Sequence, residues 1–279
     1  MSAQSKAILY ILIASIAFSF MNLVAKQLSN LPVFELVLFR AIGTSIICTT
    51  LLVKQGVPIL GSRRPILLLR AVIGCASLVL FFWSIKTIPI GTATSLRFTS
   101  PIFAAILAVW ILKEKIKPIQ WLFFLLAFIG VIVIKGFDLR VNTLGFIAII
   151  LSAILVGIVF ILIRKIGDSE HHLVIINYFM LVNISIGGLV SIFYWQTPVG
   201  IEWSLIVFIG IIGFIGQYFM TQALQTSESN MIVPFKYSEV VFSIFFAWII
   251  FGEQQSWLSI YGILLIIAGL LGNYMVKAR

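Results

Sequence analysis

The stretch TIPIGTATSLRFTSP, residues 87–101, runs on into an apolar segment and has a twin later in the chain. The twin is TSESNMIVPFKYSEV, residues 226–240, at a constant offset of 139 positions. This offset aligns Arg97 with Lys236 without a gap, and it is half the length of the 279-residue chain. Because an internal repeat decides the architecture, we interpret the chain as two homologous halves, each with a cation inside an apolar segment.

The composition indicates an integral membrane protein. Hydrophobic residues make up 61% of the chain and charged residues 10%, with a mean hydropathy of +1.17, whereas soluble domains carry about 25% charge. The formal charge of +10 does not indicate nucleic-acid binding, because no basic run exceeds two residues and no aromatic-basic platform is present. Cys48 and Cys75 stand singly inside apolar segments, so we predict neither a disulfide nor a metal site, and no cofactor.

Ten segments are apolar and about long enough to cross a bilayer. They are residues 6–26, 33–53, 66–86, 91–112, 118–134, 144–163, 173–195, 203–224, 231–251 and 257–276. Five spans per half is an odd number, so the second half enters the membrane in the opposite orientation. We therefore predict an all-α membrane protein of ten transmembrane helices in two inverted five-helix repeats, residues 1–137 and 142–279.

The distribution of lysine and arginine predicts the orientation, since cytoplasmic loops carry the excess of these residues. With both termini inside, eleven cations fall on the cytoplasmic side: Lys6, Lys54, Arg63, Arg64, Lys113, Lys115, Lys117, Arg164, Lys165, Lys277 and Arg279. Four fall on the other side: Lys26, Lys86, Lys135 and Arg140. We predict a multi-pass protein of the bacterial inner membrane with both termini cytoplasmic, as a monomer or a homodimer.

Four further cations lie within the spans, where an uncompensated charge costs about 2.5 to 3.5 kcal/mol on insertion scales. Arg70 is about four residues into its span, so we expect its side chain to reach the cytoplasmic surface as an anchor. Arg40 lies deeper, and two hypotheses stay open for it: an ion pair with Glu35, or a place in a central cavity. Arg97 and Lys236 lie about two turns into their spans at equivalent positions, and we predict that they share one central space.

Helical spacing extends this predicted site. Lys236, Glu239 and Ser243 fall at i, i+3 and i+7 and share one helix face; the equivalent face of the first half carries Arg97 and Ser100. Aromatic neighbours come from Phe98 and Tyr237, and Pro101 and Pro234 weaken the two helices where we expect them to bend. Structural neutralisation of Lys236 by Glu239 is an alternative to a role in ligand binding.

Uncharged polar residues within the spans contribute a second group of candidates. Hydrogen bonds between membrane helices are commonly worth only about 0.6 kcal/mol each, so polarity by itself marks a site poorly. From the first, third and eighth spans we nevertheless take Asn22, Trp83, Gln217 and Tyr218 as candidate binding residues.

Several of these features resemble the EamA family of the drug/metabolite transporter superfamily. The resemblance covers essentially the whole chain. It rests on the two-repeat layout, the Thr99-Ser100-Pro101 run, the Lys113-Glu114 and Gly252-Glu253 pairs that close the fourth and ninth spans, and the glycines of the fifth and tenth spans. The second half departs from the pattern at Glu239-Val240, where a proline is expected, so the resemblance does not extend to an equal bend in the ninth helix.

The resemblance implies a secondary active transporter that moves a small polar metabolite, an amino acid or a related zwitterion or organic anion, by alternating access through a central cavity. No phosphate-binding loop for ATP is present, and Glu239 is the candidate proton carrier. Alternatives are a metabolite exchanger and an uptake carrier for a nucleoside-type solute such as S-adenosylmethionine. The second alternative rests on a faint resemblance of the segments Phe39–Gly43 and Lys135–Asp138 to the same segments of family members that carry this solute.

Two distant alternatives are a membrane enzyme and a pore. The enzyme hypothesis depends on Asp168-Ser169-Glu170-His171-His172, which holds both histidines of the chain and clusters them with carboxylates as a metal or acid-base site does. The cluster falls in a short loop, and no second group completes it, so we interpret it as a solvated cytoplasmic turn. A pore is not favoured because no filter-like motif is present.

Overall fold

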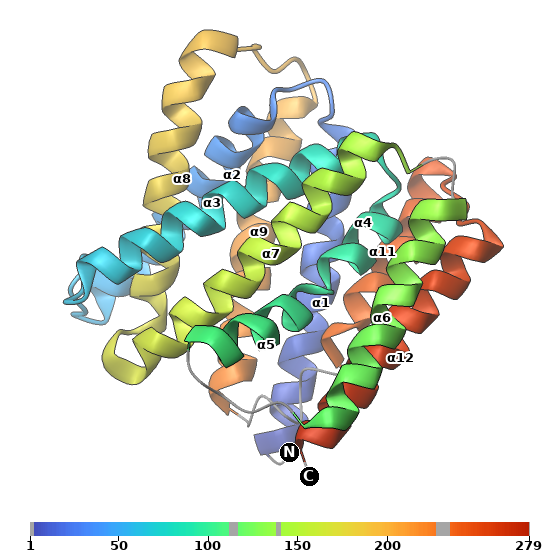
Figure 1. Ribbon diagram of the computed structural model, residues 1–279. Coiled ribbons are helices and arrows are strands. Elements are labelled where there is room, and N and C mark those ends of the chain that lie inside the picture. The colour runs from blue at the N-terminus through green and yellow to red at the C-terminus, as the bar shows by residue number, and fades with distance from the viewer. Residues whose placement is uncertain (1–2, 112–116, 138–140, 227–234, 279) are drawn as a thin grey trace.

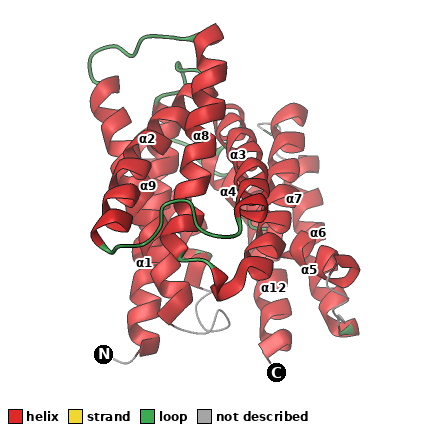
Figure 2. Ribbon diagram, turned by 90° about the vertical axis from the view of Figure 1, so that its left-hand side faces the viewer, coloured by secondary structure: helices red, strands yellow, loops and turns green. Residues whose placement is uncertain are grey.

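The computed structural model describes residues 3–111, 117–137, 141–226 and 235–278. Throughout these ranges the regular secondary structure is helical (Figures 1 and 2). The helices are α1 (Ala3–Gln27), α2 (Val33–Lys54), α3 (Arg64–Thr87), α4 (Ile90–Arg97), α5 (Ser100–Ile111), α6 (Pro118–Phe137), α7 (Thr143–Ile166), the 3-10 turn η1 (Gly167–Ser169), α8 (His172–Tyr194), α9 (Glu202–Thr226), α11 (Ser238–Phe251) and α12 (Trp257–Ala278).

These helices coincide with the ten apolar segments expected from the sequence. Six of them, α1, α2, α3, α7, α8 and α9, are long and apolar enough to cross a membrane, and the apolar parts of α6, α11 and α12 are shorter. The protein is therefore a multi-pass membrane protein. Both chain ends lie at the same end of the bundle (Figures 1 and 2), as an even number of crossings requires. We call this the terminal end, and the opposite one the distal end.

The fourth expected span is one crossing made of two helices, because the chain breaks at Phe98–Thr99 between α4 and α5. Pro101 has no backbone N–H to donate into α4, and the Thr99 hydroxyl donates to the Leu96 carbonyl oxygen at 2.6 Å, which satisfies part of the open end. The bend predicted near Pro101 is confirmed. Pro234 lies outside the described residues, but α11 begins only after a turn at Tyr237, the position 139 residues after Phe98.

Long helices pair along most of their length: α1 with α9, α2 with α8, α3 with α7, and α6 with α12. Glycines permit two of the closest approaches. A Cβ added to Gly43 of α2 stands only 2.8 Å from the Gly210 Cα of α9, and one added to Gly130 of α6 stands 2.5 Å from the Gly262 carbonyl oxygen of α12. Small residues of this kind let membrane helices pack backbone to backbone.

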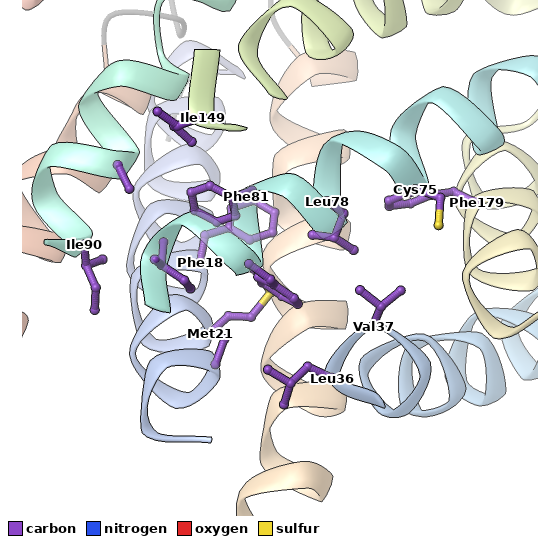
Figure 3. Close-up of a cluster of buried hydrophobic side chains, with 14 of the residues drawn as sticks. Phe18, Met21, Leu36, Val37, Cys75, Leu78, Phe81, Ile90, Ile149 and Phe179 are labelled. Carbon is purple, nitrogen blue, oxygen red and sulfur yellow. The ribbon is translucent and has the colours of Figure 1, made fainter. Parts of the chain in front are cut away.

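The apolar core runs through the middle of the bundle and draws on nearly every helix. Figure 3 shows part of it, including Met21 of α1, Phe81 of α3 and Phe179 of α8. All three side chains are buried. The arginines of the bundle interior lie against these three side chains.

Candidate functional site

Arg97 occupies the C-terminal residue of α4, next to the break between α4 and α5. Its guanidinium carbon lies 4.1 Å from the centroid of the Phe81 ring on α3. An aromatic face attracts a cation electrostatically, more strongly where water is sparse. The residues before it on α4 are buried, whereas Arg97 itself is only partly buried, so its position in the middle of a crossing leaves part of the side chain accessible.

Lys236 lies on the other side of this break. Its Nζ is 5.6 Å from the centroid of the Phe98 ring, and the Phe98 ring meets the Tyr237 ring edge-on at a centroid distance of 5.4 Å. Lys236 is partly buried, and Tyr237 is buried. The two break points of the repeat therefore meet through their aromatic residues, and each presents a cation beside them.

Glu239 sits one turn into the bundle from Lys236 and is 7% exposed. The adjoining face of α11 packs on α1: Ser19 Oγ donates to the Glu239 carbonyl oxygen at 3.1 Å, and Ser243 Oγ donates to Ser19 Oγ at 3.2 Å. Asn22 of α1 lies beside the Glu239 carboxyl. Lys236, Glu239 and Ser243 were predicted to share one helix face, and α1 packs against this face at Glu239 and Ser243.

Arg97, Lys236 and Glu239 form one electrostatic cluster. Both cations interact with the Glu239 carboxylate and with each other, as the repeat predicted. Neither cation lies within 4 Å of the Glu239 carboxylate, the distance of a close ion pair. In the part of the chain that the structure describes, such a pair is formed by Lys26 and Glu253. Lys236 lies over the Phe98 ring, and it interacts with Glu239 electrostatically without forming a close ion pair.

Arg40 joins this cluster from α2. The side chain is 1% exposed, its Nε donates to Met21 Sδ at 3.1 Å, and its guanidinium carbon is 6.0 Å from the Phe179 ring centroid. It interacts electrostatically with Arg97. Of the two hypotheses for Arg40, the ion pair with Glu35 is wrong: Glu35 Oε1 instead accepts a hydrogen bond from the Gln196 backbone N–H at 2.6 Å.

The prediction that Arg70 reaches the cytoplasmic surface is also wrong. Arg70 is 9% exposed, and its guanidinium carbon lies 4.6 Å from the Phe179 ring centroid. The position of Arg70 along its span was not enough to place its side chain, because α8 crosses the start of α3 and offers an aromatic face there. Arg70 is therefore a buried residue and not an anchor.

Four cations and one carboxylate meet in the central part of the bundle: Arg40, Arg70, Arg97, Lys236 and Glu239; the buried Glu35 is bound to the Gln196 backbone instead. Each uncompensated cation costs about 2.5 to 3.5 kcal/mol on insertion scales, and the single charge of Glu239 balances only one of the four. Aromatic faces offset only part of such a cost, at about 2 kcal/mol each when desolvated. An anionic group brought among these cations reduces the excess of positive charge.

The other candidates differ in how they relate to the cluster. Ser100 is buried at the first residue of α5, one turn from Arg97. Gln217 is partly buried on α9, one turn after Gly213, which faces Arg40. Tyr218 stacks on Phe214 and meets Phe219 edge-on. The structure does not bring Trp83 or Tyr218 into the cluster.

The distal end of the bundle carries a contact that sequence reasoning missed. Lys26, at the end of α1, forms an ion pair with Glu253, and the other oxygen of Glu253 accepts from the Ile90 backbone N–H, the start of α4, at 3.1 Å. Thr92 Oγ1 donates to Gln255 Oε1 at 3.0 Å close by. Lys26 and Glu253 both line an open pocket of about 510 Å³. They join α1 and α4 to the loop between α11 and α12.

The loop with both histidines has a structural role. Glu170 Oε1 accepts from the Ser62 backbone N–H at 2.7 Å and from the Ser62 hydroxyl at 2.8 Å, ahead of α3. His171 Nδ1 accepts from the Leu173 N–H and caps α8. Within the described ranges no group of three histidine, cysteine or acidic residues is placed to hold a metal. The arrangement holds the α2–α3 loop to the start of α8.

Burial alone raises the pKa of the Glu170 carboxyl, but hydrogen bonds from the Arg63 and Ser62 backbone N–H groups and from the Ser62 hydroxyl outweigh it and hold the pKa below its ordinary value. The carboxylate form is therefore the one that the fold favours.

Comparison with known proteins agrees with this outline. The model of the EamA-like transporter family matches the chain twice, at residues 5–136 and 143–275. The chain is similar to the pseudopaline exporter CntI of Pseudomonas aeruginosa, with 30% identity over 97% of this chain and 96% of the relative. It is also similar to the S-adenosylmethionine uptake transporter of Rickettsia prowazekii, with 28% identity over 95% and 90%.

A human protein, solute carrier family 35 member G1, is 28% identical over 96% of this chain and 78% of its own length. A solved crystal structure with 18% identity superposes with a TM-score of 0.72 over 99% of both chains, which shows a shared fold. The named relatives are transporters, not enzymes.

Proposed function

We propose, since the chain belongs to the EamA-like transporter family, that it is a secondary transporter that moves a small anionic or zwitterionic metabolite across the bacterial inner membrane. The observation that carries this proposal is the cluster of Arg97, Lys236 and Glu239, to which Arg40 adds a third cation. A solute with an acidic group finds fixed positive charge there, in surroundings where each charge interacts more strongly than in water.

The predicted inverted repeats find support in the packing of the helices. In two repeats of five crossings, α1 corresponds to α7 and α3 corresponds to α9. The α1–α9 pair is therefore equivalent to the α7–α3 pair, and both pairs pack closely. The glycines agree: Gly130 faces the Gly262 carbonyl oxygen, and Gly269, 139 positions after Gly130, faces the carbonyl oxygen of Phe123, 139 positions before Gly262. The two family matches divide the chain at the same place.

The charge balance also bears on the class of solute. An organic anion compensates the excess of cations directly. A zwitterion such as an amino acid leaves the net charge unchanged but can pair its carboxylate with Arg97 and its ammonium group with Glu239. S-adenosylmethionine, the solute of one relative, carries a sulfonium cation in addition to its amino-acid group, and the excess positive charge of this chain disfavours it.

Alternating access requires a central site that is closed to one side at a time. The Lys26–Glu253 ion pair and the Glu253–Ile90 hydrogen bond join parts of both halves at the distal end. α4 packs against α11 toward this end, whereas α5 packs chiefly against α7. Together with the partial exposure of Arg97 and Lys236, this supports a state closed at the distal end.

Counterflow into vesicles that contain the purified full-length protein tests this function. Vesicles preloaded with a mixture of unlabelled amino acids and dicarboxylates are given the same solutes in labelled form, together with the diamides of the dicarboxylates as neutral, matched controls. We expect accumulation of one or more acidic or zwitterionic solutes and none of the neutral amides. Accumulation of neutral and charged forms alike, or of none of them, contradicts the proposal.

Single cysteines test the inverted arrangement in the same preparation. Lys117, before α6, and Gln254, after α11, should be labelled by a membrane-impermeant reagent from opposite sides. Labelling of both from one side is incompatible with two inverted repeats.

A further inference from the structure

We infer that Arg40 and Arg70 form a second anion subsite, which adjoins the Arg97–Lys236–Glu239 cluster through Arg40 and takes a carboxylate group of the solute. The inference rests on the proposed function, because it concerns a part of the solute that the central cluster does not contact. It assigns a ligand-binding role to Arg70 and Phe179, and it makes the preferred solute one with two acidic groups.

The two guanidinium groups share one aromatic platform. Their central carbons lie 6.0 Å and 4.6 Å from the Phe179 ring centroid of α8, and they come from two different helices, α2 and α3. Both residues are more than nine-tenths buried. Two like charges in electrostatic contact repel each other, so the fold holds a locally unfavourable arrangement that a bound anion relieves.

Hydrogen-bond donors of both guanidinium groups are left without partners among the described residues. Arg40 Nη1, Arg70 Nε and Arg70 Nη1 are buried and donate no hydrogen bond to any described part of the protein, although each guanidinium carries five N–H donors in a planar fork that matches a carboxylate. The side-chain amide of Asn183, one turn beyond Phe179 on α8, is fully buried and likewise unpartnered among the described residues. Buried donors of this kind are almost always satisfied in proteins.

The protein's own carboxylates do not serve this pair. Glu239 interacts with Arg97 and Lys236, and Glu35 is bound to the Gln196 backbone. No close ion pair to either arginine is present in the part of the chain that the structure describes. We therefore assign the compensating charge to a ligand.

Glycines stand where the helix backbones come nearest to the pair. A Cβ on Gly74 of α3 lies 3.1 Å from the Phe179 ring and 3.9 Å from Arg70 Nη1, and one on Gly213 of α9 lies 3.2 Å from Arg40 Nε. Larger residues there displace the platform or a guanidinium. Because Arg40 also interacts with Arg97, the subsite adjoins the central cluster, and a solute with two acidic groups can contact both.

The test compares each dicarboxylate with its own monomethyl ester, which lacks one acidic group but keeps the same carbon chain. Succinate, glutarate and adipate and their monoesters are titrated against the purified full-length protein at constant ionic strength, with binding measured by thermal shift and calorimetry. We expect at least one dicarboxylate to bind about tenfold more tightly than its monoester. In Arg70→Gln this ratio falls to within twofold, because the dicarboxylate loses the partner of its second acidic group.

Arg64→Gln is the matched control, because Arg64 is an exposed arginine at the start of the same helix; it keeps the full ratio. Ligand-free Arg70→Gln melts at a higher temperature than wild type, since an unpaired buried cation is removed, whereas loss of a purely structural contact lowers the melting temperature. Phe179→Leu keeps an apolar side chain without the aromatic face, and it lowers the ratio in a protein that remains folded.

A ratio that is equal in wild type and Arg70→Gln overturns the inference, as does a wild type that binds no dicarboxylate more tightly than its monoester. The proposed function is judged separately by the monoesters in Arg97→Gln. If their binding is unaffected by this change, the central site fails. If it is lost there and only the Arg70 result is negative, the second subsite alone fails.

Discussion

Replacing Glu253 by glutamine removes the charge that, in the proposed transport mechanism, holds the distal end closed. The substitution keeps the size of the side chain, but it removes the ion pair with Lys26 and weakens the hydrogen bond accepted from the Ile90 N–H. The side chains of Lys26 and Glu253 are 19% and 16% exposed, so the contact lies between a surface pair, worth about 0.2 to 1 kcal/mol, and a buried pair, whose breaking costs about 3 to 5 kcal/mol.

We take about 1 to 2 kcal/mol for this intermediate case, which shifts the balance between closed and open distal ends by roughly 5- to 30-fold. Ser95 is a suitable reporter, because it is 1% exposed, lies one turn inward from Gly91 on α4, and donates its hydroxyl hydrogen bond to the Gly91 carbonyl of its own helix. In a background without Cys48 and Cys75, the Ser95→Cys protein in vesicles is treated with an impermeant maleimide from the distal side.

Labelling should become roughly 5- to 30-fold faster in Glu253→Gln, in line with the population of the open state. Lys26→Gln should have a similar effect, and the double variant should add little to either, since both changes break one contact. Glu202→Gln is the control, because Glu202 is a carboxylate at the same end that bonds within its own loop. Equal labelling rates in wild type and Glu253→Gln, or additive effects in the double variant, refute the reasoning.

The structure predicts three further outcomes. Glu239→Gln should reduce the counterflow of a zwitterion at least tenfold relative to that of an anion of similar size, because the partner of its ammonium group is lost; zwitterion transport that persists without its pH response assigns Glu239 to proton coupling instead. As pH falls through the lowered pKa of Glu170, its contribution to stability is lost, so amides 62 and 63 should exchange faster in acid after correction for intrinsic rates, and Glu170→Gln should abolish this pH dependence. Gly43→Ala should destabilise the protein by about 1 to 3 kcal/mol through overpacking against Gly210, whereas Gly188→Ala, whose new Cβ meets Leu38 at 3.7 Å, should melt within a degree or two of wild type.

The crossings and the central cluster were predictable because the chain repeats itself. Hydrophobic length located the ten segments, and the 139-residue offset paired Arg97 with Lys236 from the sequence alone. The break at Tyr237 repeats the one at Phe98 even though Glu239-Val240 stands where a proline was expected. The residues that follow the two breaks therefore differ, whereas the helix is interrupted at equivalent positions in both halves.

Contacts between distant parts of the chain could not be predicted in this way. Arg70 was misplaced because its depth along α3 says nothing of Phe179, which belongs to the other half of the chain. Lys26 and Glu253 are 227 positions apart, and Glu170 and Ser62 are 108 apart. A single sequence gives no signal that connects such residues, because each is unremarkable in its own segment.

The central claim is that fixed positive charge from both halves binds the transported solute, and counterflow in vesicles with Arg97→Gln and Lys236→Gln tests it most directly. Each change removes a charged hydrogen-bond donor, worth about 1.5 to 3 kcal/mol, so each should lower counterflow of the acidic or zwitterionic solute roughly 10- to 150-fold. Arg64→Gln and Lys54→Gln, at exposed positions, should transport at the wild-type rate. Wild-type rates in correctly folded Arg97→Gln and Lys236→Gln proteins would contradict the claim.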